Sequence, residues 1–411
     1  MMKNVMMKRF FFLVILLAVW IHGGSSVICA SEPKPGDVIS SSNIDQYEDY
    51  FPPYIARFIK DGWGFVKPVT IHVGEPKLLP TGKVFKKATE QNAGKVKLSP
   101  DGLLEGYPDL GLPFPDPKEP DLALKIIWNR YYAWFVDDWS MPGGTYHTFS
   151  QRSGGPVAHA QASYDCLRFS NRTMVPPVPE LDNPNQLFWS TLLDSETPPN
   201  RGMATLTWRY KDPVKEDDMW TYIPTMRRTL RMVSSERANP IRGTPLTWDD
   251  IFGFDGKIPN FNYAYVGEKK TLVLSNHQRW VHDLPGKEWN HPIVFGPEEP
   301  WELKNTYLIE ITPKDPRYPM SKRVVWVIDE NWKINNAAIY DKNGEFWKGY
   351  FQSQKHTVVD AGDGKENYAF TMSLGITDFK TQYWTLGMFD SLLLNRGLQT
   401  GMFTPTALGR D

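Results

Sequence analysis

The stretch RVVWVIDENWKINNAAIYDKNGEFWKGYFQ, residues 323–352, carries the clearest signal for the architecture of this chain. It begins with an apolar run, Val324 to Ile328, which is typical of a buried strand. After a polar turn, apolar and polar side chains alternate from Ile334 to Tyr340, and Asp341 to Gly344 (DKNG) supplies a tight turn with a glycine available for positive φ. We therefore predict three consecutive antiparallel strands, a β-meander.

A period of two also recurs elsewhere in the chain. Apolar and polar side chains alternate from Ala204 to Tyr210, and the MWTYIP segment that follows makes Ala204 to Pro224 a predicted hairpin. Aromatic residues make up 14% of the chain, and 34 prolines and 31 glycines interrupt it. This composition favours many short strands over long helices. The other predicted strands are Thr229–Val233, Phe261–Val266, Thr271–Leu274, Tyr307–Thr312, Arg323–Ile328 and Glu345–Phe351.

Two segments are candidates for helices. The first, Tyr47–Ile59, has prolines where a helix would begin and Gly62 just past its end. The second, Leu122–Phe135, is apolar on nearly every side, which indicates a helix buried beside a sheet, but its aromatic and β-branched residues favour a strand almost equally. Because no linker or repeat is visible, we predict a single domain over residues 31–411 with an irregular N-terminal segment, residues 31–125.

The N-terminus has the order of a secretory signal peptide. Basic residues at positions 3, 8 and 9 precede an apolar run from Phe10 to Ile21, and small residues then lead to Ala30. An apolar run of about twelve residues is too short to span a membrane, which takes roughly 20. We therefore predict that residues 1–30 are a signal peptide cleaved near Ala30 and that the mature protein is exported.

The two cysteines leave one alternative open. A lipoprotein signal would place the lipid on Cys29, but Ile28 stands where such signals need a small residue. If Cys29 leaves with the signal, Cys166 is the only thiol, so no intramolecular disulfide can form although an exported protein could hold one. The 46 basic and 47 acidic side chains nearly balance, which does not favour nucleic acid as a partner.

Five motifs together resemble one protein family. They are GLPFPDP (111–117), KIIWN (125–129), DDMWTYIPTMRRTLRM (217–232), LTWDDIFGFDGKI (246–258) and IDENWKINNAAIYDKNGEFWK (328–348). The family is a bacterial outer-membrane lipoprotein-sorting-like family, domain-of-unknown-function family 1329, and the strand motifs are also similar to those of the LolA/LolB lipoprotein carriers. The resemblance implies a mainly β (α+β) fold: a large curved antiparallel sheet, a LolA/LolB-like half-barrel, with a few helices covering the concave face over an apolar cavity. It also implies lipid or lipid-like cargo and no enzymatic reaction.

The predicted lining of that cavity consists of aromatic side chains on strands in which apolar and polar residues alternate. Each methylene of a buried acyl chain contributes about 0.8 kcal/mol, so an apolar lining alone can hold such a chain. The predicted ligand-binding aromatic residues are Trp208, Tyr210, Trp220, Tyr222, Trp326, Tyr340 and Trp347. The alternative is that these residues form only the core of the sheet.

Arg228 is the predicted polar part of the binding site. On a strand it shares a face with Met226, Leu230 and Met232, so its side chain is expected to point toward the apolar side. An inward guanidinium needs a partner, and the phosphate or carboxylate of a lipid headgroup fits its fork of donors. The alternatives are an internal salt bridge, or an irregular strand that lets Arg228 reach solvent.

Other polar residues are candidates for metal ligands or catalytic groups. Four candidate metal ligands share a loop-rich stretch, but their spacing matches no compact metal motif. They are His277, His282, Asp283 and His291. Asp137 and Asp138 with His147 suggest acid–base chemistry, yet adjacent residues on a strand point in opposite directions, so solvated loop charge is the preferred interpretation. Cys166 is expected to be buried and inert. We predict no catalytic residues, no metal and no cofactor.

The leading hypothesis is a carrier or chaperone in the periplasm, with a possible association with the outer membrane. It would bind a lipid, a lipoprotein acyl chain or another hydrophobic molecule and move it between the inner and outer membranes. Its expected partners are that cargo, an inner-membrane exporter of the resistance-nodulation-division type and an outer-membrane protein. The alternatives are a hydrolase that acts on an envelope lipid or glycan through loop carboxylates, and a non-enzymatic protein-binding scaffold.

Overall fold

The computed structural model describes residues 31–79, 81–133, 136–278, 299–360, 364–389 and 391–409. The predicted signal peptide, together with His282, Asp283 and His291, lies outside the described residues. Within the described ranges, no helix has both the length and the apolar character needed to cross a membrane.

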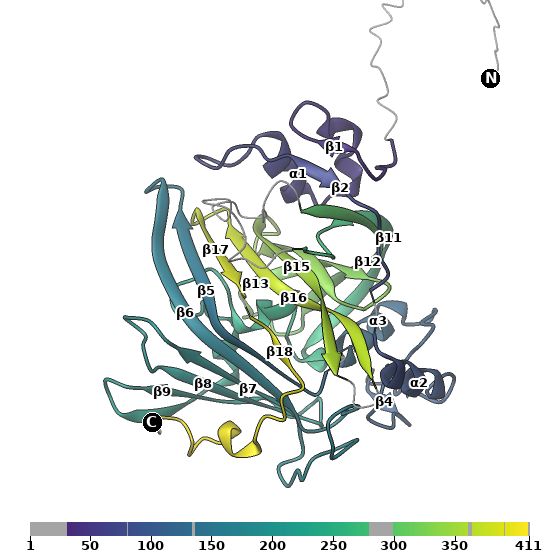
Figure 1. The fold of residues 1–411 in the computed structure, drawn as a ribbon, viewed down its shortest axis with the longest axis vertical. Coiled ribbons are helices and arrows are strands. Elements are labelled where there is room, and N and C mark those ends of the chain that lie inside the picture. Colours follow the sequence, from purple (N-terminus) through teal and green to yellow (C-terminus); the bar gives the residue numbers. More distant parts are fainter. Residues whose placement is uncertain are drawn as a thin grey trace, which may run out of the picture.

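One large sheet forms the body of the protein (Figure 1). It has 16 strands in the order β1-β2-β12-β13-β14-β15-β16-β17-β5-β6-β7-β8-β9-β10, with β11 paired to β12 and β18 paired to β5. Every neighbouring pair is antiparallel except β2 with β12, which is parallel. The strands are β1 (Val38–Ile39), β2 (Ile71–Val73), β5 (Asp138–Ser150), β6 (Gly155–Arg168), β7 (Leu187–Ser195), β8 (Ala204–Tyr210), β9 (Asp218–Ile223), β10 (Arg228–Met232), β11 (Phe261–Val273), β12 (Pro300–Pro313), β13 (Met320–Ile328), β14 (Ile334–Asp341), β15 (Phe346–Asp360), β16 (Lys365–Asp378), β17 (Tyr383–Met388) and β18 (Leu393–Leu394). A separate two-stranded hairpin consists of β3 (Lys97–Leu98) and β4 (Leu104–Glu105).

The predicted β-meander is confirmed as β13, β14 and β15. Val324 on β13 pairs with Ala338 on β14, and Ala338 pairs in turn with Gly349 on β15. The turn between β14 and β15 contains Gly344 with a φ of 78°, a conformation that a residue without a Cβ adopts at little cost. The register follows from the alternation, because a shift of one residue would move every apolar side chain to the opposite face.

The predicted hairpin from Ala204 to Pro224 is also confirmed, as β8 and β9. The two predicted strands Phe261–Val266 and Thr271–Leu274 are parts of one longer strand, β11, which is interrupted by a bulge between Tyr265 and Gly267. The strands β16 and β17, which complete the sheet between β15 and β5, were not predicted.

Three α-helices are present, and each lies in the N-terminal third of the described residues. They are α1 (Pro53–Lys60), α2 (Lys83–Gln91) and α3 (Leu122–Tyr132). For Leu122–Phe135 the helical alternative is the correct one, and α3 is buried on most sides because it lies against the sheet. Figure 1 shows α1 at the top of the view, whereas α2 and α3 lie at the lower right.

The two faces of the sheet have different coverings. The concave face packs against α3 and against residues 237–261, a segment of short 3-10 turns that we call the inner segment. The opposite, outer face is covered in two places: by α1 and its neighbours over β13–β17, and by the C-terminal tail, residues 396–409, over β6–β9. The predicted mainly β fold, one curved sheet with few helices, is confirmed.

Candidate functional site on the concave face

The helix α3 covers the concave face through aromatic packing. Tyr131 stacks on Phe188 of β7 with ring centroids 5.2 Å apart, and Trp128 stacks on Tyr132 within the helix at 6.0 Å. The polar groups of α3 bond to loops: the side chain of Asn129, for example, bonds both the N–H and the C=O of Phe114. Among the described residues, none of the hydrogen bonds or ion pairs joins α3 to a strand of the sheet. The described contacts that hold the helix on the sheet are therefore apolar and ring contacts, together with the guanidinium of Arg209 on β8, which lies 5.7 Å from the centre of the Tyr131 ring.

The inner segment is fixed in a different way, by a buried ionic cluster. The cluster contains three cations and three carboxylates: Arg209, Arg237, Lys257, Asp217, Asp249 and Asp255. Arg209 on β8 bonds Asp217 at 2.8 Å and Asp255 at 2.7 Å, and Arg237 bonds Asp249 at 2.8 Å. Burial alone would raise the pKa of Asp217, but the facing cations outweigh burial and hold this pKa below its ordinary value. The three positive charges are balanced by three negative charges, and Arg209 belongs to the sheet. The cluster therefore ties the inner segment to the sheet.

Little empty space remains beneath these coverings. One cavity of about 10 Å³ lies under the inner segment beside Cys166, and another of about 20 Å³ lies at the C-terminal end of α3 beside Arg130 and Lys333. The second can hold about one water molecule. At these two places the concave face is closely packed in this conformation, and neither internal space is a large apolar cavity.

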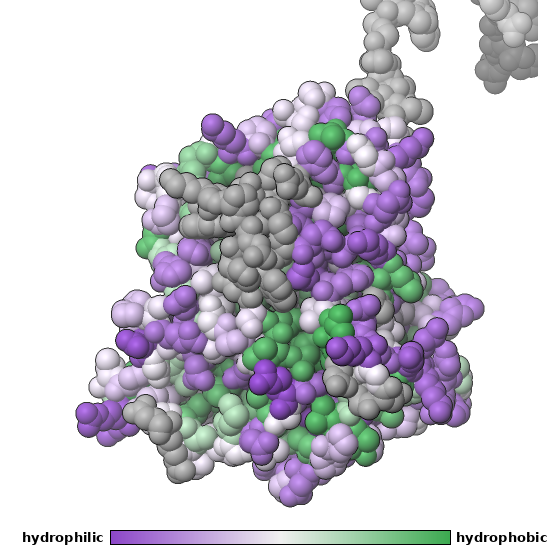
Figure 2. Space-filling view, in the orientation of Figure 1, coloured by the Kyte–Doolittle hydropathy of each residue, from purple (hydrophilic) through white to green (hydrophobic). Residues whose placement is uncertain are grey.

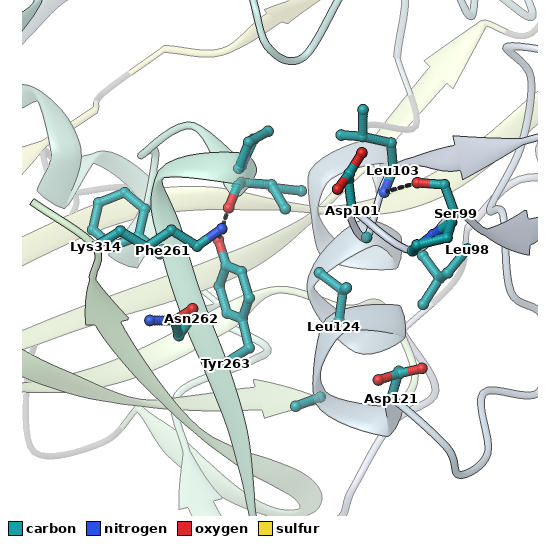
Figure 3. A pocket seen from close by; sticks show the side chains of 15 residues that line it. Leu98, Ser99, Asp101, Leu103, Asp121, Leu124, Phe261, Asn262, Tyr263 and Lys314 are labelled. Carbon is teal, nitrogen blue, oxygen red and sulfur yellow. Dashed lines mark hydrogen bonds between the residues drawn. The ribbon is translucent and has the colours of Figure 1, made fainter.

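Larger pockets lie at the rim, where α3 meets β11. A pocket of about 530 Å³ separates the start of α3 from the start of β11, and Figure 3 shows Leu124 and Tyr263 on its two sides. Tyr263 is held there by donating its hydroxyl to the carbonyl of Ile258 at 3.0 Å. A pocket of about 830 Å³ adjoins it and shares Phe261 and Lys314 with it.

Part of the concave face also reaches the surface. Figure 2 shows hydrophobic surface in the middle of the view, in the region where Figure 1 places β16 and β18. Leu392 and Leu394 are partly buried and pack against the apolar cluster between the concave face, α3 and the inner segment, which we call the concave-face cluster. An exposed apolar area rimmed by polar residues marks an interaction site more often than a random surface does.

Six of the seven predicted aromatic ligand residues lie on the outer face. Trp208, Tyr210, Trp220 and Tyr222 pack beneath the C-terminal tail, and Trp326 and Tyr340 pack beneath α1. The seventh, Trp347, packs against the concave-face cluster and donates to Asp378 at 3.0 Å. The structure therefore does not bring the seven into one cavity, and their packing agrees with the alternative of a sheet core. Their role in binding stays a prediction.

The expectation that Arg228 points inward is wrong. Arg228 does share a face with Leu230 and Met232, as predicted, but β10 is the edge strand of the sheet and both Arg228 and Leu230 are exposed. A side chain at such an edge is solvated and needs no internal partner.

Asp137 and Asp138 are buried, so their interpretation as solvated loop charge is wrong. Asp137 accepts bonds from the N–H groups of residues 173–175, and Asp138 accepts bonds from those of residues 396–398. Each carboxylate anchors a different loop. His147 instead faces His159, with their Nδ1 atoms 3.4 Å apart, and burial together with His159 lowers the pKa of His147 to about 4.

The remaining residues of interest are not arranged as catalytic or metal sites. Cys166 is buried as predicted, and burial raises the pKa of its thiol well above the ordinary value. His277 lies 3.4 Å from Glu299, and the described part of the chain contains no group of three or more side chains that could hold a metal ion.

Arg130 and Lys333 were not among the predicted site residues. Burial, the largest cause, lowers the pKa of Arg130 to about 10, and burial together with Arg130 lowers the pKa of Lys333 to about 7. A signal for Arg130 was present, because it is a charged residue in the last turn of a mostly apolar helix. Lys333 follows a polar turn and offered no such signal.

Comparisons with known proteins agree with this architecture. A profile of the family described as "Protein of unknown function (DUF1329)" matches residues 38–408. Among solved structures, a "putative outer membrane lipoprotein-sorting protein domain" from Vibrio parahaemolyticus has a TM-score of 0.50 and 16% identity, over 71% of this chain and 99% of that one. None of the curated proteins matches.

Two further solved structures have lower scores. A DUF1329 family protein from Desulfovibrio piger has a TM-score of 0.49 and 16% identity, covering 69% of this chain and 96% of its own. A LolA superfamily protein from Nitrosomonas europaea has a TM-score of 0.41 and 14% identity, covering 69% and 97%. At these identities the likeness concerns the fold alone.

Proposed function

We propose that this chain, which belongs to the DUF1329 family of proteins of unknown function, binds a lipid or another hydrophobic molecule on the concave face of its sheet, beneath α3. The observation that carries the proposal is the way α3 is held. Because none of the described hydrogen bonds or ion pairs of α3 goes to a strand, the helix can move off the sheet by giving up apolar and ring contacts, among them the contact of Arg209 with the Tyr131 ring.

The energy of such an exchange supports the proposal. Moving α3 uncovers apolar surface at about 25 cal/mol per Å², and an acyl chain that takes its place recovers about 0.8 kcal/mol per methylene. A chain of about a dozen carbons can thus replace most of the contact that the helix gives up. The rim pocket between Leu124 and Tyr263 offers a place where the chain could enter.

We extend the proposal to the cell envelope. The N-terminal residues have the order of a signal peptide, and a structure with the same fold carries a description that refers to outer membrane lipoprotein sorting. The protein would act in the periplasm without catalysis, receive cargo from an inner-membrane exporter of the resistance-nodulation-division type, and deliver it to an outer-membrane protein. Of the described carboxylates considered for hydrolysis, Asp137 and Asp138 are bonded to backbone N–H groups, so no observation favours an enzyme.

Two neighbouring leucines on β7 provide the test. Leu192 and Leu193 are equally buried, at 8% exposure each, but Leu193 faces the concave side and Leu192 faces the outer side. Residues 31–411 would be purified, analysed by native mass spectrometry with organic extraction, and titrated with laurate and 1-dodecanol. We expect co-purified lipid and saturable binding of at least one dodecyl compound.

The matched variants decide where the ligand lies. Leu193→Ala should weaken that binding roughly 4- to 60-fold, because one to three methylenes of contact, at about 0.8 kcal/mol each, are lost. Leu192→Ala should cost similar stability and leave the affinity unchanged. Absence of both lipid and saturable binding, or equal affinity losses in the two variants, would exclude the proposed site.

A further inference from the structure

The small cavity at the C-terminal end of α3 is lined by two cations with no acidic partner. Arg130 comes from the last turn of α3, and Lys333 comes from the residue before β14. Gln352 and Thr371, from β15 and β16, add polar groups to the same cavity and are almost fully buried. The helix α3 and the sheet beneath it thus place four polar side chains around one small cavity.

Neither cation forms an ion pair within the described chain, although the more distant charge of Asp255 favours the charged form of Arg130. Arg130 donates to the carbonyl of Phe252 at 3.1 Å, and Lys333 donates to the carbonyl of Ala369 at 2.7 Å, but no carboxylate lies within ion-pair distance of either. In contrast, the buried Arg209 and Arg323 each bond an aspartate directly.

The donors of the two cations exceed the bonds they make. A guanidinium carries five N–H donors and an ammonium carries three, and one bond is described for each side chain. Two uncompensated cations in a region of low dielectric are unfavourable unless an anion joins them. The lowered pKa values of both groups agree with this: burial is the largest cause for each, and the charge of Arg130 lowers the pKa of Lys333 further.

The other walls of the cavity are apolar. Phe252, Trp332 and Ile334 line it, and all three belong to the concave-face cluster that packs against α3. A volume of about 20 Å³ holds about one water molecule, so a hydrocarbon chain does not fit and an acidic headgroup would enter only when α3 moves and the cavity widens. A chain attached to that headgroup would run from the cavity onto the apolar face beneath the helix.

We propose that Arg130 and Lys333 bind the carboxylate or phosphate headgroup of an acidic single-chain amphiphile, and that the cargo of the concave face is therefore anionic. This inference rests on the proposed function. Arg130 supplies a planar pair of donors to the headgroup oxygens, and Lys333 supplies a point charge from the opposite wall.

The test compares the binding affinities of ligands that have the same chain length but different headgroups. Laurate and dodecyl phosphate should bind residues 31–411 at least tenfold more tightly than 1-dodecanol. Lys333→Met should remove this preference and leave the affinity for 1-dodecanol within twofold of the original. The control is Lys348→Met, because Lys348 is also buried and donates to a carbonyl, that of Pro245 at 2.8 Å, but does not line the cavity.

The outcomes separate the two proposals. If 1-dodecanol binds as tightly as the acids, the proposal of an anionic headgroup site is overturned, whereas the proposed carrier function is not. This result needs only the protein without substitutions. If no dodecyl compound binds, the carrier itself fails. Inorganic phosphate should compete with laurate only at far higher concentration, and micromolar competition would overturn the assignment to a headgroup. Lys333→Gln is the second variant, should Lys333→Met not fold.

Discussion

Replacing Asp217 with asparagine should destabilise the protein by about 3–5 kcal/mol, the cost of removing one partner from a buried ion pair. Asp217 is 4% exposed and lies 2.8 Å from Arg209, 3.1 Å from Arg237 and 3.5 Å from Lys257. The three cations of the cluster are balanced by three carboxylates, so the substitution leaves one positive charge buried without compensation. The cost arises from that charge, not from a change in side-chain volume.

Urea unfolding at pH 7, followed by fluorescence, measures this loss as a difference in the free energy of unfolding. The control is Asp315→Asn, which removes an ion pair to Arg317 in which both partners are largely exposed. That substitution should change the stability by less than about 0.5 kcal/mol. A loss below about 1 kcal/mol for Asp217→Asn would refute the reasoning that the cluster fixes the inner segment.

The pH dependence supplies a second measurement of the same effect. The folded-state pKa of Asp217 lies below the ordinary value near 4, so its contribution is fully present above that value and is lost as the pH falls through the folded-state pKa. The difference in stability between the original protein and Asp217→Asn should therefore be constant from pH 5 to 7 and shrink as the pH falls below about 4.

Three further substitutions have defined outcomes. Gly349→Ala should destabilise the protein by about 1–3 kcal/mol in urea, because the added Cβ would lie 2.6 Å from the ring of Tyr54 on α1. Trp208→Phe removes the bond from the indole N–H to the carbonyl of Phe403, 2.7 Å long, and should speed hydrogen exchange in residues 396–409 without changing ligand affinity. Lys333→Met should raise the stability at pH 7, since it removes a buried positive charge. The original protein should gain stability as the pH rises from about 7 toward 10, where the unfolded chain binds more protons than the folded one, and Lys333→Met should lack that gain.

Much of the sheet could be predicted because its strands alternate along the sequence. The meander of β13–β15 and the hairpin of β8 and β9 are local, so period and turn residues sufficed for both. The strands β16 and β17 escaped prediction: Tyr368–Asp378 of β16 is buried on both faces, between α1 and the concave face, and shows no clean alternation. For the same reason the sequence of α3 left helix and strand open, since a helix buried on most sides loses its amphipathic pattern.

The functional surface was harder to predict because each face of the sheet is covered by distant parts of the chain. Alternation placed Trp208 and Tyr210 on a common face correctly, but it could not reveal that the C-terminal tail covers that face. Likewise, the strand face on which Arg228 lies was predicted correctly. Its position at the edge of the sheet was not, because it depends on the strand order, which no local sequence pattern contains. The stronger clue was Arg130, a charge within an apolar helix, because such a charge must find a partner when the helix is buried.

The contrast between the two coverings of the concave face indicates which of them can move. Lifting the inner segment would separate Arg209 from Asp255 and Arg237 from Asp217, and would expose charges that only each other neutralise. Lifting α3 breaks no described hydrogen bond or ion pair to a strand, only ring and apolar contacts such as that of Arg209 with the Tyr131 ring, and the apolar surface it leaves can be covered again by an acyl chain. Arg130 moves with α3, whereas Lys333 stays with the sheet, so an acidic headgroup would bind most tightly when the two are close. The arrangement therefore links closure of the helix to the charge of the ligand.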